Sequence, residues 1–442
     1  MSQFKTTPPE ITTLPGGTPY IIGNEAAERF SFYGMRAILV VFMTQYLLTS
    51  DGQADYMSND EAKGWFHLFV SAVYFTPLLG ALISDGIFGK YRTIITLSLV
   101  YTAGHFALAI DDSRLGLAIG LGLIAVGAGG IKPCVSAHVG DQFSHANSHL
   151  LPRVFGWFYF SINLGAFSST LLIPWLLENY GSSIAFGVPG ILMLIATIIF
   201  WSGRYRFVHI PAGRMIFLQE TFSRDGLTAL AKLSIIYIFV AMFWALFDQT
   251  ASSWVIQAES MDREVAGIEI LPAQMQAANP LLVMLLIPVF SYLVYPVIDK
   301  VFRLTALRKI SIGLFITVFA FCVSALIQEK IDAGLSPHIS WQILAYIILT
   351  SAEVMISITC LEFSYTQAPV RMKSFIMAFF MMSIAIGNLF TSAVNFFIAN
   401  DDGSSKLAGA DYFWFFSGLM LVTAVLFIFV ARNYKEKTYL QE

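Results

Sequence analysis

The stretch IAFGVPGILMLIATIIFWS, residues 184–202, contains no charged side chain over 19 consecutive positions. As an α-helix it would extend about 28 Å at 1.5 Å per residue, which is close to the thickness of the hydrocarbon core of a bilayer. Because lipid offers no hydrogen-bond partner to the backbone, a single segment crosses it as a helix. This stretch therefore predicts a transmembrane helix.

Runs of the same character recur along the chain and predict an all-α integral membrane protein with twelve transmembrane helices. The 442 residues are 56% hydrophobic and only 12% charged, whereas ordinary soluble domains carry about 25% charged residues. The run at 19–49 is the least apolar, because it holds four charged side chains. The twelve predicted spans lie near residues 19–49, 62–84, 93–110, 115–140, 153–177, 184–202, 232–259, 273–298, 307–327, 341–366, 374–398 and 411–431.

The basic residues alternate between the predicted loops and so test this count of spans. With the N-terminus in the cytoplasm, 17 of the 26 Lys and Arg residues fall in cytoplasmic segments, five in the opposite loops and four inside spans. Cytoplasmic loops are enriched in Lys and Arg, so we expect both termini to be cytoplasmic. The N-terminal segment lacks the pattern of a cleaved signal peptide, and we expect the first span to direct insertion.

The longest polar segment inside the chain, residues 203–231, separates the twelve spans into six and six. We therefore predict an N-terminal six-helix bundle over residues 1–203, a cytoplasmic linker over 204–231 and a C-terminal six-helix bundle over 232–442. Two bundles of this kind commonly enclose a central site near the middle of the membrane.

Several classes of protein are disfavoured by the composition. No basic stripe of the kind that binds nucleic acid is present. The three cysteines lie in apolar runs without the spacing of a metal site or a disulfide framework. We find no nucleophile–base constellation and no phosphate-binding loop. We therefore expect no enzyme, no cofactor and no metal.

Charged side chains inside the first span indicate an internal polar site. A charge at the bilayer centre costs about 2.5–3.5 kcal/mol on insertion scales, so such residues usually face a cavity or a partner. Glu25 and Arg29 are four residues apart and face one another on one helix. Arg36 lies two turns beyond Arg29, and together with Glu28 and Tyr33 these residues form a strip that we expect to face inward.

Lys132 is a lone cation in an apolar run and requires an anion. It follows three glycines within Gly127–Pro133, which allow another helix to approach closely. The span at 341–366 offers an anion at Glu353, with Ser357 on the same helical face, whereas Glu362 lies about half a helical rotation away and would serve another contact. We predict a gating salt bridge between Lys132 and Glu353, which would connect the two bundles.

Other polar residues inside apolar spans are candidates for the lining of a central cavity. Each has a structural alternative: a histidine that only donates a hydrogen bond, asparagines that hold helices together, or an aspartate that pairs with a helix end. The residues alone leave these alternatives open. They are His67, Tyr74, Tyr159, Asn163, Trp244, Asp248 and Asn279.

The sequence between the second and third spans resembles a loop of the major facilitator superfamily. It reads GALISDGIFGKYR, residues 80–92, and contains Asp85, Gly89 and Lys90. Its glycines permit a tight turn, and Asp85 can pair with a basic residue or cap a neighbouring helix. An ordinary basic loop is the alternative interpretation.

Four further motifs resemble the proton-coupled oligopeptide transporter (POT) family of that superfamily, and its di- and tripeptide branch in particular. The motifs lie in the first, fourth, fifth and tenth spans, and an additional match in the seventh span extends the resemblance to both halves. They are EAAERFSFYG at 25–34, GIKP at 130–133 with DQF at 141–143, FYFSINLG at 158–165, LEFSYTQAP at 361–369 and FWALFDQ at 243–249.

This resemblance implies a proton-coupled symporter that imports di- and tripeptides by alternating access. It implies that Arg29, Arg36 and Lys132 hold the peptide carboxylate and that Glu353 holds the peptide amine. Its implied proton-coupling residues, together with our candidate His67, are Glu25, Glu28, Arg29, His67 and Glu353. The substrate-binding set is Arg29, Tyr33, Arg36, Tyr74, Lys132, Tyr159, Asn163, Trp244, Asn279, Glu353 and Ser357.

The implied partners are the peptide, protons and the lipid bilayer, and we expect a monomer in the plasma membrane, most simply a bacterial inner membrane. Three departures from the family pattern stand out. Phe32 replaces a motif tyrosine, Ser291 stands where animal members have an acid that would pair with the base at Lys232, and two helices common in bacterial members are absent. The rival interpretations are a carrier of nitrate or another small anion and a membrane-bound peptide sensor.

Overall fold

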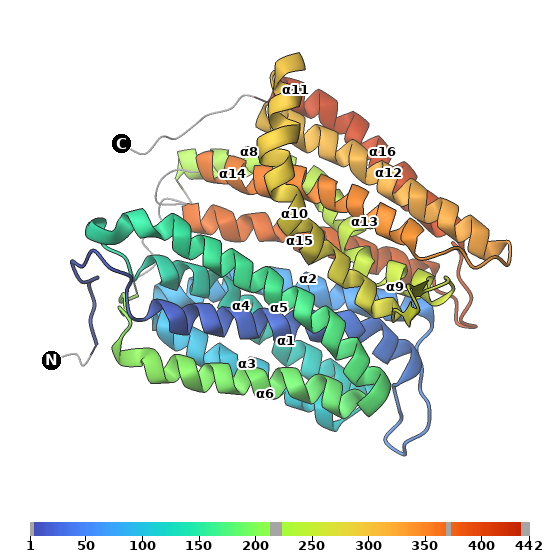
Figure 1. Ribbon diagram of the computed structural model, residues 1–442, viewed down its shortest axis with the longest axis horizontal. Coiled ribbons are helices and arrows are strands. Elements are labelled where there is room, and N and C mark those ends of the chain that lie inside the picture. Colours follow the sequence, from blue (N-terminus) through green and yellow to red (C-terminus); the bar gives the residue numbers. More distant parts are fainter. Residues whose placement is uncertain (1–3, 213–222, 368–372, 435–442) are drawn as a thin grey trace. The chain divides into compact units, whose positions relative to one another are not determined.

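The computed structural model describes residues 4–212, 223–367 and 373–434 (Figure 1). Within these residues, eleven helical segments are long and apolar enough to cross a membrane. Helix α1, which is 28 residues long and carries four charged side chains, is the twelfth long helix. The first six spans are α1 (Thr18–Gln45), α2 (Asn59–Ile83), α3 (Lys90–Ile110), α4 (Arg114–Gly140), α5 (Leu151–Tyr180) and α6 (Ser182–Ser202).

The later spans are more broken than the sequence predicts. The predicted span at 273–298 is interrupted by the π-helical turn η6 (Phe290–Val294), and the one at 341–366 by η7 (Val354–Ile358). π-Turns are rare and frequent at functional sites. The remaining helices are α8 (Arg224–Phe247), α9 (Ser253–Glu259), α10 (Ala278–Val289), α11 (Tyr295–Val301), α12 (Ala306–Asp332), α13 (Ser340–Glu353), α14 (Thr359–Thr366), α15 (Lys373–Ile398) and α16 (Ala410–Asn433).

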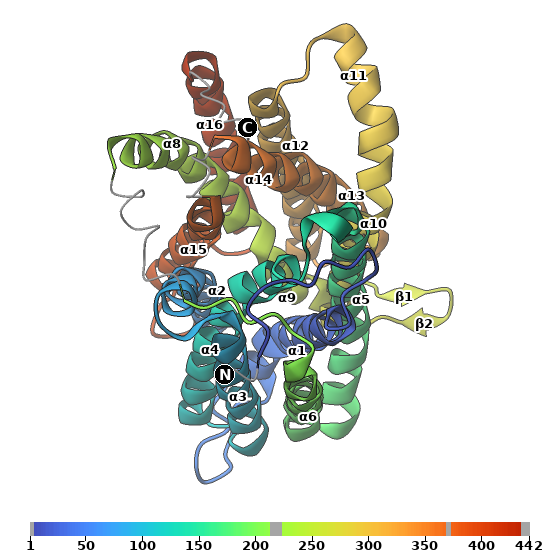
Figure 2. The same ribbon diagram turned by 90° about the vertical axis from the view of Figure 1, so that its left-hand side faces the viewer.

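Short elements complete the chain between these helices. The strands β1 (Glu264–Val265) and β2 (Ile268–Glu269) form an antiparallel hairpin (Figure 2). Its two turn residues, Ala266 and Gly267, have φ of 53° and 81°, as a tight two-residue hairpin turn requires. The other short segments are the π-turn η1 (Ser84–Phe88) and the 3₁₀ turns η2 (His145–Leu150), η3 (Gly203–Tyr205), η4 (Asp248–Ala251) and η5 (Pro272–Ala277).

The contacts divide the chain into two compact units. The first comprises residues 1–56 and 72–218, and the second comprises residues 57–71 and 219–442. Helix α2 therefore contributes its first half to the second unit and the remainder to the first unit. The division into bundles at 1–203 and 232–442 stays a prediction, and α8 begins eight residues before position 232.

Glycines set the close packing inside the first unit, in which α1 packs against α5 and α6, and α3 packs against α4 and α6. A Cβ atom added at Gly127 would lie 2.6 Å from Cβ of Tyr101 on α3. One added at Gly34 would lie 2.6 Å from the side chain of Ile173 on α5. The close approach that we expected of the glycines in α4 is thus present.

We expect Gly80→Ala to destabilise the first unit by about 1–3 kcal/mol, the usual cost of overpacking. A Cβ atom there would lie 2.5 Å from Cα and 2.9 Å from the carbonyl oxygen of Gly130, and neither backbone atom can turn aside. Thermal unfolding in detergent checks this. Gly122→Ala is the matched control, because a Cβ atom at Gly122 meets nothing within 4 Å. An unchanged midpoint for Gly80→Ala would contradict the close contact of Gly80 with Gly130.

The loop between α3 and α4 provides a pH-dependent test of stability. Ser182 donates a 2.7 Å hydrogen bond to Asp112, yet burial and the nearby Asp111 raise the pKa of Asp112 above its ordinary value. A raised folded-state pKa stabilises the fold below the unfolded pKa of about 3.9, and this contribution is lost as the pH rises through the folded-state pKa. Asp112→Asn keeps an oxygen that accepts from Ser182 and removes the carboxylate charge that is unfavourable at pH 7. We therefore expect a thermal midpoint about 1 °C higher than that of wild type at pH 7, and no gain near pH 3.5, where the wild-type carboxyl is largely protonated.

Candidate functional site

A compact cluster of charges lies inside α1. Glu25 and Glu28 are 1% and 0% exposed. Nε of Arg29 donates to Oε1 of Glu25 at 2.7 Å and lies 3.4 Å from Oε2 of Glu28. The close pairing of Glu25 with Arg29, four residues apart, is therefore present as expected. One guanidinium serves two buried carboxylates, so the three groups carry a net negative charge when both acids are ionised.

Lys132 on α4 lies in the electrostatic neighbourhood of this cluster. It is 5% exposed, and its charged neighbours include Glu28, Arg29 and Glu25. Nζ lies 3.6 Å from the centroid of the Phe32 ring and 5.0 Å from that of Tyr74, and it makes no hydrogen bond within the described part of the chain. Phe32, which replaces a motif tyrosine, thus places a ring face beside the Lys132 ammonium. Cation–π attraction to this ring offsets part of the cost of burying the ammonium.

The remaining candidates of the first unit lie on α1, α2 and α5. Arg36 is buried and Tyr33 and Tyr74 are half-buried. Asn163 donates to the carbonyl oxygen of Tyr159 at 2.9 Å, one turn earlier on α5. This bond occupies one donor of the Asn163 amide and leaves its carbonyl oxygen for another partner.

In the second unit, two candidates that the sequence suggested separately are in direct contact. Nδ2 of Asn279 donates to Oε2 of Glu353 at 2.7 Å and to Oγ1 of Thr350 at 3.2 Å. This links α10 to the end of α13, directly before η7. Trp244 is buried, and its indole nitrogen has no hydrogen bond within the described ranges; Ser357 lies half-buried in η7.

His67 lies at the centre of a buried hydrogen-bond network in the second unit. Nδ1 lies 2.7 Å from Oδ1 of Asn388, and Nε2 lies 2.8 Å from Oγ of Ser252. Nδ2 of Asn388 donates to Asp248 at 2.6 Å, which assigns its amide oxygen to His67. Since that oxygen only accepts, Nδ1 carries the hydrogen, and Nε2 accepts from Ser252 when the imidazole is neutral.

Ser252 and Asn388 are functional candidates that the sequence analysis missed. Asn388 could have been found, because it is a polar residue in the apolar run at 374–398, the same signal that indicated Asn163. Ser252 gives no such signal, since a hydroxyl can bond to its own helix.

A family model described as the POT family matches residues 91–224 and 214–415. The chain belongs to the POT family. The match confirms the resemblance carried by the motifs, and solved structures of POT family members confirm the all-α membrane fold.

Named POT relatives and solved structures agree with this assignment. The chain is 34% identical over 409 residues to solute carrier family 15 member 2 of Rattus norvegicus, covering 81% of this chain and 55% of that protein. It is 38% identical over 366 residues to peptide transporter family 1 of Drosophila melanogaster, covering 72% of this chain and 48% of that protein. The chain thus spans about half the length of these curated relatives, whose names are those of transporters and not of enzymes.

Two crystal structures of POT family members cover almost the whole chain. An auto-inhibited POT family peptide transporter superposes with a TM-score of 0.87 at 37% identity, over 97% of this chain and 99% of that one. A POT family transporter solved in meso gives a TM-score of 0.85 at 37% identity, over 96% and 99%. The chain is therefore a multi-pass membrane protein.

The loop at 80–92 and the DQF motif at 141–143 contact one another at the start of α3. Gly89 adopts a positive φ of 76°, which favours glycine. Lys90 forms an ion pair with Asp141, Nζ to Oδ2 at 2.8 Å, and Asp141 begins the DQF motif that carried part of the resemblance. The side chain of Asp85 lies outside the described residues.

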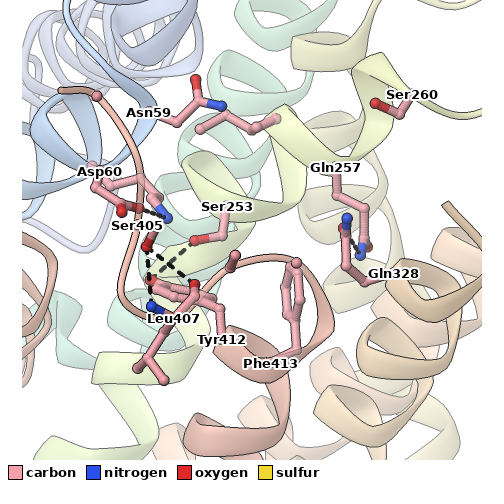
Figure 3. A pocket seen from close by; sticks show the side chains of 15 residues that line it. Asn59, Asp60, Ser253, Gln257, Ser260, Gln328, Ser405, Leu407, Tyr412 and Phe413 are labelled. Carbon is pink, nitrogen blue, oxygen red and sulfur yellow. Dashed lines mark hydrogen bonds and ion pairs between the residues drawn. The ribbon is translucent and has the colours of Figure 1, made fainter. Parts of the chain in front are cut away.

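A cavity of about 310 Å³ lies in the second unit of this POT member and is lined by residues that include Asp60, Ser253 and Tyr412 (Figure 3). Lys63 and Asp60 form a 2.6 Å ion pair on α2, and Nζ of Lys63 lies 3.9 Å from the centroid of Tyr412. Ser253 donates to the Tyr412 hydroxyl at 3.2 Å. Because Ser253 directly follows Ser252, the cavity wall and the partner of His67 belong to one segment of chain.

Proposed function

We propose that this chain is a proton-coupled symporter that imports di- and tripeptides by alternating access. The observation that carries the proposal is the buried Glu25–Arg29–Glu28 cluster beside Lys132. Burying two acids and two bases inside one unit lowers the stability of the fold. Such charges are therefore retained when they bind a charged ligand or carry a proton. The peptide transporters named among its relatives support the same class of substrate.

The proposed substrate contacts follow from the charges of a peptide zwitterion. Arg29, Arg36 and Lys132 bind the carboxylate, and Glu353 binds the amine. Because the peptide ends and backbone are recognised, the side chains are free to vary, and specificity is broad. The proposed backbone and side-chain contacts are Asn163, Asn279, Tyr33, Tyr74, Tyr159, Trp244 and Ser357.

The proposed proton steps use groups whose partners change on protonation. Neither carboxylate oxygen of Glu28 accepts a hydrogen bond among the described residues, so a proton on Glu28 would weaken its electrostatic attraction to Arg29 and Lys132 without breaking a hydrogen bond. A proton on His67 goes to Nε2 and reverses its hydrogen bond, so that the ring donates to Ser252. Peptide binding also breaks the proposed Lys132–Glu353 pair, and each event shifts the equilibrium between two conformations of the protein.

The driving force is sufficient for accumulation. A proton that crosses about 100 mV gains about 2.3 kcal/mol, and one pH unit adds about 1.36 kcal/mol. One proton per peptide therefore permits roughly 500-fold accumulation. We also propose that the chain works as a monomer in the plasma membrane, a bacterial inner membrane in the simplest case, with both termini in the cytoplasm.

The deciding experiment is uptake of labelled dialanine into proteoliposomes that contain the purified chain, with and without an inward proton gradient. We expect accumulation only with the gradient, and its loss in Glu28→Gln, which cannot release a proton. Binding without uptake would identify a sensor instead. If dialanine neither binds nor enters, nitrate is the next substrate, and nitrate uptake would replace the peptide proposal.

A further inference from the structure

Lys232 is a basic side chain that the proposed transport cycle does not use. It lies eight residues, or about 12 Å, from the start of α8 and is half-buried. Within the described ranges, its ammonium makes no ion pair or hydrogen bond, and the same holds for the guanidinium of Arg224 at the start of the helix. A cation at this depth in a membrane requires an anion.

The two cations line one groove on α8, which continues past Lys232 to Ile235. The groove encloses about 620 Å³, and its wall between the cations is mostly apolar. Leu227 and Ile235 are 48% and 46% exposed, and Ala231 lines the groove between them in the sequence. The lining residues recur at helical spacing along a single face: Arg224, Leu227, Thr228, Ala231, Lys232 and Ile235.

We propose that this groove binds one anionic phospholipid. The phosphate would lie between Arg224 and Lys232, and an acyl chain would follow Ala231 and Ile235 toward the membrane centre. A guanidinium binds phosphate oxygens through two parallel hydrogen bonds, and a lysine inside a span extends its ammonium toward the interface.

The charges of the groove select among the possible occupants. An anionic headgroup balances the two cations better than a zwitterionic headgroup, whose own ammonium adds a third positive charge. The Thr228 hydroxyl donates to the carbonyl oxygen of Arg224 at 2.7 Å, so the two cations supply the donors for the phosphate. The lipid would hold the start of α8, and this proposal does not depend on the peptide as substrate.

Native mass spectrometry of the full chain, released from vesicles with equal phosphatidylglycerol and phosphatidylcholine, tests the proposal. We expect wild type to retain phosphatidylglycerol preferentially. Lys232→Met and Arg224→Gln should each reduce that retention about fivefold, the value of one cation near an anionic lipid surface. Lys232→Arg should restore it.

Lys406→Met is the matched control, because the Lys406 ammonium already donates to the carbonyl oxygen of Phe397 at 2.6 Å and lies outside the groove. Its lipid retention should equal that of wild type. Equal retention of the two lipids by wild type would overturn the proposal, as would unchanged phosphatidylglycerol retention in Lys232→Met. A lipid-free dimer of the chain in the mass spectrum would also overturn it, because a second copy would then cover the groove. Thermal midpoints in pure phosphatidylcholine, expected to match wild type, establish that each variant is folded.

Discussion

Lys132→Ala will abolish the accumulation of labelled dialanine against its gradient in proteoliposomes. The variant removes the ammonium that lies beside the Phe32 ring and among the charges of Glu25, Glu28 and Arg29. Truncating one partner of a buried, hydrogen-bonded charge pair in a binding site costs about 2–5 kcal/mol of binding free energy, and about 2.7 kcal/mol corresponds to about 100-fold. Since Lys132 is proposed to bind the peptide carboxylate, we expect uptake to fall by about 100-fold or more.

Two controls separate a loss of function from a loss of fold. Lys406→Met removes a lysine whose ammonium donates to the carbonyl oxygen of Phe397 and lies 4.7 Å from the centroid of its ring, and it should accumulate dialanine as wild type does. The thermal midpoint of Lys132→Ala should fall by no more than a few degrees, because the alanine also removes the burial cost of the cation. Full accumulation by Lys132→Ala would refute the proposed role of this lysine in binding and gating.

His67→Gln will remove the stimulation of uptake by an inward proton gradient but preserve exchange of labelled for unlabelled dialanine. A glutamine amide can keep one hydrogen bond of the network to Asn388 or Ser252, but it cannot take up a proton. The roughly 500-fold accumulation allowed at one proton per peptide should therefore fall to near unity. Uptake and exchange, measured side by side at several external pH values, give the result.

Ser252→Ala is the informative companion variant. It removes the partner of Nε2 at 2.8 Å and leaves the Asn388 contact at 2.7 Å in place. We expect reduced coupling, since Nε2 is the nitrogen that takes up the proton. If His67→Gln accumulates dialanine in full, the histidine is only a hydrogen-bond donor, which is the alternative that the sequence left open.

The sequence by itself determined the features that depend on local spacing. Long apolar runs predicted the helices, and four-residue spacing predicted the contact of Glu25 with Arg29, because both follow from the geometry of one helix. The motifs of α1, α4, α5 and α14 indicate the POT family without reference to any tertiary contact. The helix interruptions at η6 and η7 were not predicted, since a π-turn changes the hydrogen-bond register without a clear change in hydrophobicity.

The tertiary structure decided which residues face one another across helices. His67 with Asn388, Asn279 with Glu353, and Lys132 with Phe32 are separated by 321, 74 and 100 positions. Spacing along one helix determines which residues share a face of that helix. The residue that they contact on a neighbouring helix depends on the rotation, depth and distance of that helix. Those are set by small side chains and van der Waals packing in the membrane, so the sequence named the polar residues and only the packing chose their partners.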